Sequence, residues 1–225
     1  MASLDTYLGQ THHTVQTALD NPEISARLAE KTMYEPAELE GGLALWDTMN
    51  TAVGDTQQKR ADQKAATDTL LPLLKTLNES LRDLAYVVNT YLGKDHPART
   101  ALGLDKRIPT GQEALLAYAA HVFNAGQTLA DPEAAATLTK TKWDVERMAA
   151  ELVQTQAVAA ANQAQENAKG ETARAYDLQF QAIDAFHTWL LPLVKDCRRR
   201  ALKDRPDLLQ AMGLDKKTPR KPGRS

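Results

Sequence analysis

An internal duplication is the feature that most limits what this chain can fold into. The run Leu102–Lys106, with a proline three residues later, returns 110 positions further on as Met212–Lys216, again followed by a proline. Near the start of each copy, Asn21-Pro22-Glu23 returns as Asp131-Pro132-Glu133 at the same spacing. Because these matches include proline and glycine at corresponding breaks, we interpret them as a true repeat rather than as coincidence between Ala- and Leu-rich helices.

The register of the repeat changes between these two anchors. In the middle of each copy the spacing is 109 residues, so that Lys94–Pro97 corresponds to Lys203–Pro206 and Leu84 to Leu193. One residue is therefore lost after the first anchor and one is gained before the last. We predict two tandem helical repeats, residues 1–110 and 111–215, that share one core and are followed by a basic tail at residues 216–225.

The residue pattern predicts helices almost throughout. Asn21 and Asp131 each precede Pro-Glu, a typical helix start, because the side chain caps free N–H groups and proline fits the first turn. Later in each copy, apolar residues recur at steps of three or four, as expected for one face of a helix. The first stripe is Leu70, Leu74, Leu77, Leu81, Leu84, Val88 and Leu92. The second stripe is Phe180, Ile183, His187, Leu190, Val194, Cys197 and Ala201.

The centre of each copy leaves two interpretations open. Residues 36–93 and 144–203 are each one long helix with a kink near Pro72 or Pro192, or each is a hairpin broken at Gly54 or Gly170. We favour the long helices. The predicted fold is thus an all-α, elongated helical bundle, made of two pseudo-symmetric halves with long helices around an internal two-fold axis.

Each copy is predicted to end in the same way. Pro97 and Pro206 open a helix of one or two turns, and Gly103 and Gly213 close it. Glycine is suited to this position because it tolerates the left-handed backbone conformation that ends many helices. The last short helix of each copy is therefore predicted to end in the same glycine motif.

The composition places the chain among ordinary globular proteins. Of 225 residues, 43% are hydrophobic and 25% are charged, which excludes collagen-like and fully disordered chains. No apolar run approaches the ~20 residues that cross a bilayer, and the first residues do not resemble a signal peptide. With a single cysteine, these features predict a cytoplasmic protein without disulfide bonds and without membrane association.

No pattern in the sequence predicts an active site, a cofactor or a metal centre. The histidines lack the Glu-x-x-His spacing of di-iron bundles, and phosphate-binding loops and Cys-x-x-Cys pairs are missing. His187 and Cys197 fall on the apolar stripe, so we interpret both as core residues. For Cys197 the weaker alternative is a reactive thiolate beside Lys195 and Arg198. The three tryptophans are expected to fill gaps in the core rather than to line a ligand pocket.

Charge is unevenly distributed along the chain. From Lys195 to Ser225 there are eleven basic and four acidic residues, a net charge of +7 in a chain whose total is −2. This end is suited to an acidic protein, to nucleic acid or to the acidic face of another copy. The other interpretation is a solubilising tail after a helix whose C-terminal end favours cations. The candidate anion-binding residues are Arg198, Arg199, Arg200, Lys203, Lys216, Lys217, Arg220 and Lys221.

The doubled pattern, with Asn or Asp before Pro-Glu and a Leu-Gly-Leu or Met-Gly-Leu ending, resembles uncharacterised bacterial all-helical proteins. In those proteins a unit of about 110 residues is duplicated. The resemblance covers most of residues 20–215 and implies no activity or site. We predict a non-catalytic scaffold or protein-interaction protein that binds a protein partner or itself. The alternatives are a nucleic-acid-associated protein that uses its basic C-terminal segment, and a small-ligand binder with its site between the two halves.

Overall fold

The structure is a computed structural model that describes residues 3–215, and every regular element in that range is a helix. The elements are α1 (Leu4–Asp20), α2 (Pro22–Lys31), α3 (Pro36–Tyr91), α4 (Pro97–Ala101), α5 (Gln112–Gln127), α6 (Pro132–Lys140), α7 (Val145–Asp196), η1 (Cys197–Ala201) and α8 (Pro206–Ala211). The order of α1 to α4 is repeated in α5 to α8, as the duplication requires. The all-α prediction is confirmed.

The two long helices are continuous, which excludes the hairpin alternative. Helix α3 has 56 residues and α7 has 52, with Gly54 inside the first and Gly170 inside the second. Pro72 and Pro192 also lie within these helices. A π-helical turn, η1, continues the chain beyond α7. Within the described residues, no helix combines the length and the apolar character needed to cross a membrane.

Both copies begin their second helix with the predicted cap. The Asn21 side-chain oxygen accepts hydrogen bonds from the backbone N–H groups two and three residues later, at 3.0 and 3.2 Å. The Asp131 side chain accepts the same two bonds at the same distances. These bonds satisfy N–H groups that have no partner inside the helix, which explains why both copies place Asn or Asp before Pro-Glu.

Both copies also end on the predicted glycine. Gly103 and Gly213 have φ angles of +74° and +70°, in the left-handed region. The leucine after each glycine donates its backbone N–H to the carbonyl five residues earlier, at 2.9 and 2.8 Å. This is the hydrogen bond of a Schellman motif, and it turns the following chain back over the short helix.

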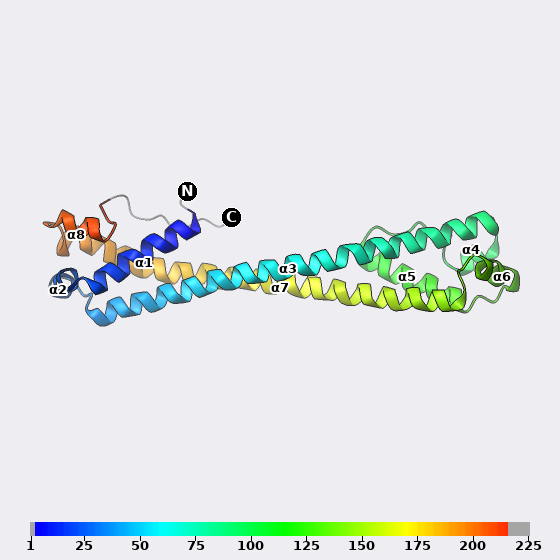
Figure 1. Ribbon diagram of the computed structural model, residues 1–225, viewed down its shortest axis with the longest axis horizontal. Helices are drawn as coiled ribbons and strands as arrows, with labels where there is room; N and C mark the ends of the chain where they lie inside the picture. Colours follow the sequence, from blue (N-terminus) through cyan, green and yellow to red (C-terminus); the bar gives the residue numbers. More distant parts are fainter. Residues whose placement is uncertain (1–2, 216–225) are drawn as a thin grey trace. The chain divides into compact units, whose positions relative to one another are not determined.

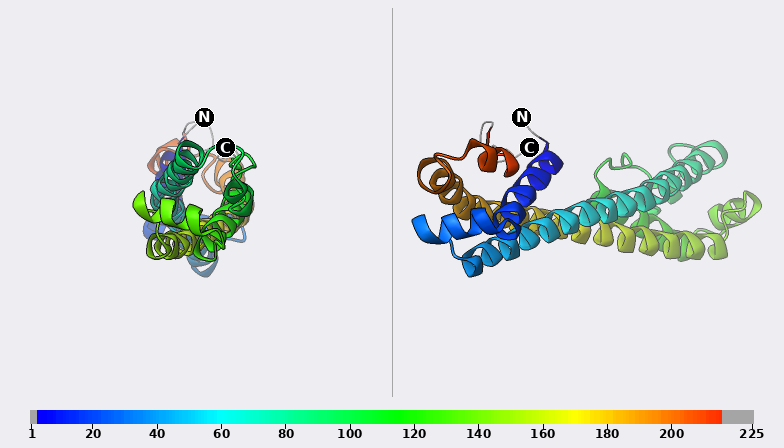
Figure 2. Two further views of the ribbon diagram at one scale, coloured as in Figure 1. Left: turned by 90° about the vertical axis from the view of Figure 1, so that its right-hand side faces the viewer. Right: turned by 60° about the vertical axis from the view of Figure 1, so that its left-hand side comes forward.

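The chain forms two compact units, and each unit takes one part from each copy. Unit 1 consists of the described residues up to Arg60 and from Glu171 onward, and unit 2 consists of Ala61–Gly170. Unit 1 contains α1, α2, the start of α3, the end of α7, η1 and α8; unit 2 contains the rest of α3 and α7 with α4, α5 and α6 (Figures 1 and 2).

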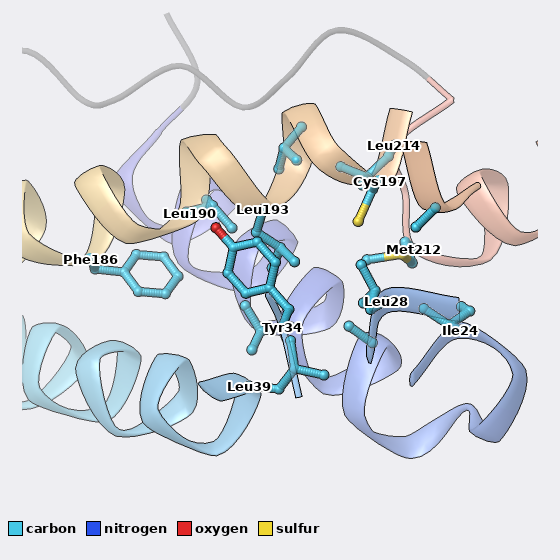
Figure 3. Close-up of a cluster of buried hydrophobic side chains, with 14 of the residues drawn as sticks. Ile24, Leu28, Tyr34, Leu39, Phe186, Leu190, Leu193, Cys197, Met212 and Leu214 are labelled. Atoms are coloured by element: carbon cyan, nitrogen blue, oxygen red, sulfur yellow. The ribbon is translucent and has the colours of Figure 1, made fainter. Parts of the chain in front are cut away.

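The hydrophobic core follows this division. The sequence predicts one core shared by both repeats; in the structure each unit has its own cluster of buried residues, and each cluster combines residues of both repeats. In unit 1, the apolar stripe of the second copy packs against α1, α2 and the start of α3 from the first copy (Figure 3). This follows because the stripe lies at the far end of α7 from α5 and α6, the two short helices that begin its own copy.

Candidate partner-binding groove

The predicted anion-binding residues are only partly available for binding. Four of them lie outside the described residues: Lys216, Lys217, Arg220 and Lys221. Arg198 is half-buried, and two of its guanidinium nitrogens donate to the Leu214 carbonyl oxygen at 3.2 and 2.9 Å, so it secures the chain after α8. Arg200 is exposed and lies 3.8 Å from the carboxylate four residues before it. Arg199 and Lys203 are exposed on the same unit.

Cys197 has the environment of a core residue. Its side chain is fully buried and points toward Leu28 and Met212 (Figure 3). Burial raises the pKa of the thiol to about 12, since the thiolate loses its hydration. That environment disfavours the reactive thiolate, and the core interpretation is confirmed. His187 is half-buried, and its ring centre lies 6.4 Å from that of Tyr7. The described residues contain no group of three or more side chains that is suited to a metal ion.

The two units pair α3 with α7 in the same register. In unit 1, Gly42 of α3 lies directly against the indole ring of Trp189 of α7. In unit 2, the Ser80 hydroxyl of α3 donates to a Glu151 carboxylate oxygen of α7 at 2.9 Å. Gly42 and Glu151 are 109 positions apart, and so are Ser80 and Trp189. Equivalent positions of α3 and α7 therefore face each other in both units: glycine faces tryptophan in unit 1, and serine is hydrogen-bonded to glutamate in unit 2. The spacing of 109 can thus be used to compare the helix pairs of the two units residue by residue.

Close contacts hold the two helices together near Arg60 and Glu171, where the α3 and α7 segments of unit 1 end. The Thr56 hydroxyl donates to the Ala175 carbonyl oxygen across the helix pair at 3.1 Å. The Thr172 hydroxyl donates to the Lys59 carbonyl oxygen at 3.0 Å. The Lys59 ammonium also forms a 2.6 Å salt bridge with Glu171. Since the residue number falls along α7 as it rises along α3, the helices run antiparallel here.

Beside these contacts, α3 and α7 form an open groove of about 1030 Å³ within unit 1. Leu178 of α7 lines it and is 61% exposed. Asp47 and Asp55 of α3 and Arg174 of α7 also line the groove, and all three are exposed. The groove thus combines an apolar anchor with charges on both of its rims.

The corresponding positions of unit 2 lack this chemistry. At the spacing of 109, the charged residues Asp47, Asp55, Lys59 and Arg174 correspond to Gln156, Ala164, Ala168 and Ala65. Leu178 corresponds to Thr69, and of the groove's charges only Glu171 keeps its sign, as Asp62. The sequence-based predictions missed this groove because each of its residues alone is typical of an exposed helix face. The signal that identifies the groove is a difference in charge between the two copies when they are aligned at the spacing of 109.

Comparison of the chain with models of protein families, with curated proteins and with solved structures finds no match. The groove is therefore interpreted from its own geometry, and the resemblance to duplicated bacterial helical proteins stays a prediction.

Proposed function

We propose that the protein is a non-catalytic, cytoplasmic protein-interaction protein that binds a helix of a partner protein in the α3–α7 groove of unit 1. The observation that supports this is the contrast between the groove and its internal counterpart. Unit 2 packs the same two helix segments with mostly alanine, glutamine and threonine at these positions. The charges and the exposed leucine of unit 1 are therefore not needed for α3 and α7 to pack together.

A helix is the partner structure that suits an open trough between two antiparallel helices. A third helix places residues at i, i+3, i+4 and i+7 into such a trough. The groove extends along α3 from Asp47 to Lys59, which is about 18 Å or three helical turns. Burying Leu178 against such a helix contributes roughly 1.5–3 kcal/mol, which is a large part of the affinity of a small docking site.

The chemistry of the groove fits binding better than catalysis. Its ionisable side chains lie on exposed rims, and Lys59 and Glu171 already neutralise each other at one end. An active site of the acid–base type needs groups whose surroundings shift their proton affinity, and these are commonly buried. Charged rims around an apolar centre are typical of protein-binding surfaces.

The test is site-specific photo-crosslinking in cells that express the full chain. A benzophenone amino acid replaces Leu178 in one variant and Thr69, the exposed counterpart in unit 2, in the other. We expect an adduct with one helical segment of another protein from position 178 and none from position 69. Equal adducts from both positions, or none from either, would contradict the proposal.

A further inference from the structure

We infer that the partner helix carries two basic residues seven or eight positions apart along one edge and an acidic residue on its opposite edge. This inference rests on the proposed function and adds the chemistry of the partner. It follows from the positions of three charged residues around the groove, two on the α3 rim and one on the α7 rim.

The α3 rim is acidic at two levels. Asp47 and Asp55 are eight residues apart, which is about 12 Å along a helix axis. They therefore lie on one face of α3, and both carboxylates are exposed. A helix that lies along this rim reaches both with side chains seven or eight positions apart, and complementary charge requires Lys or Arg there.

The α7 rim carries a positive charge at only one of these levels. Because Thr56 is hydrogen-bonded to Ala175 and the helices are antiparallel, Asp55 and Arg174 lie on either side of this contact, about 3 Å apart in height on opposite rims. At the height of Asp47, the α7 rim is formed by uncharged residues. The partner's acidic residue is therefore needed only beside Arg174, and this asymmetry also selects one direction for the bound helix.

The apolar anchor lies between these charged levels. Arg174, Leu178 and Ala182 follow one another at steps of four along α7, so they form one stripe of the groove. The partner residue that faces Leu178 is apolar, because a polar group there would lose its hydration without gaining a hydrogen bond. The inferred motif is thus an apolar stripe with basic residues on one edge and an acidic residue near one end of the other.

Two designed helical peptides test this motif against the full chain. Each is a stapled helix of about 18 residues, or five turns, with the same leucine stripe. The Lys-edge peptide has two lysines seven positions apart on one edge and a glutamate on the other, and the Glu-edge peptide has these charges inverted. Binding is measured by fluorescence anisotropy with native protein, with Asp47→Lys/Asp55→Lys, and with a control, Glu30→Lys/Glu40→Lys, which makes the same charge change on exposed helix residues outside the groove lining.

We expect the Lys-edge peptide to bind native protein about tenfold more tightly than the Glu-edge peptide, since the exposed charge pairs with Asp47, Asp55 and Arg174 all change from attraction to repulsion. The Asp47/Asp55 variant reverses this preference and the control keeps it. Equal binding of both peptides, or an unchanged preference in the variant, overturns the inferred charge pattern.

The crosslinking result separates this inference from the proposed function. If either peptide still crosslinks at position 178, the proposed function survives the loss of the charge pattern. If neither peptide binds and position 178 gives no adduct, both proposals fail. A crosslink from Leu178 to a second copy of the chain overturns the inference, because the occupant is then the protein itself.

Discussion

The adjacent glycines Gly41 and Gly42 provide a sharp test of the helix register on which the groove depends. Both lie inside α3, where replacing glycine by alanine stabilises the helix by about 1 kcal/mol. A Cβ at position 41 meets nothing within 4 Å, whereas a Cβ at position 42 overlaps the indole of Trp189. Overpacking of this kind costs about 1–3 kcal/mol. We therefore expect Gly41→Ala to stabilise the protein by about 1 kcal/mol and Gly42→Ala to destabilise it by about 1 kcal/mol.

Urea unfolding followed by far-UV circular dichroism measures this difference of about 2 kcal/mol between neighbouring substitutions. The same two changes are then repeated in a Trp189→Leu background, which removes the ring. There the two alanine variants should differ by less than about 0.5 kcal/mol, as independent sites do. If Gly42→Ala is as stable as Gly41→Ala with the tryptophan present, or if the difference persists without it, the contact between residues 42 and 189 is wrong. The residue-by-residue comparison of the two units then loses its basis.

Further predictions concern the chain ends and the buried thiol. Gly103→Ala should destabilise more than Gly213→Ala in thermal unfolding, because both residues have positive φ but a Cβ at 103 also lies within 3.0 Å of the His121 ring; equal losses would contradict this. The Cys197 thiol should react with a disulfide reagent at pH 8 only after unfolding, and fast reaction of the folded protein would refute its burial. Since the folded state keeps this proton to a pKa of about 12 and the unfolded state loses it near 9, stability should fall as the pH rises above about 9. Cys197→Val, which copies Val88 of the first repeat, should remove the part of this stability loss that the thiol causes. An unchanged dependence of stability on pH would contradict the raised pKa of the buried thiol.

The helical elements were predictable because their signals are local. Asn21 and Asp131 cap the helices that the Pro-Glu pattern indicates, and Gly103 and Gly213 close the last helix of each copy. The predicted ranges 36–93 and 144–203 are close to α3 (Pro36–Tyr91) and to α7 with its π-helical extension. Which parts of the chain pack together was harder to predict, since the spacing of an apolar stripe does not indicate which copy's short helices it contacts. Only the three-dimensional structure shows that each unit combines both copies.

The spacing of the repeat changes before the two helix caps. Asn21 and Asp131 match at a spacing of 110 residues, but the buried faces of the preceding helices α1 and α5 match at 108, so that Val15 corresponds to Phe123. The difference arises because α1 runs directly into the cap of α2, whereas three residues separate α5 from the corresponding cap. Apolar residues at helix spacing match at several registers, and burial decides among them.

The candidate site was not predictable from residue types alone. Asp55 or Arg174 on a helix surface is ordinary, and the sequence directed attention to the basic C-terminal segment instead. There Arg198 proves to be engaged with the Leu214 carbonyl, a role that depends on how the chain folds back after α8. The groove becomes visible only when the pairing of Gly42 with Trp189 fixes the register and shows which residues of the two copies are equivalent.

That equivalence also determines how many partner helices one chain binds. If two identical halves formed the two units, every residue that shapes the groove in unit 1 would recur in unit 2, and the chain would carry two equal sites. In this chain Leu178 has become Thr69 in the counterpart, and Arg174 has become Ala65. Both the apolar anchor and the opposing charge are therefore missing from unit 2, and we expect isothermal titration calorimetry with the Lys-edge peptide to give one site per chain. Two sites of similar affinity would show that neither residue contributes to recognition, and the internal contrast would then lose its functional meaning.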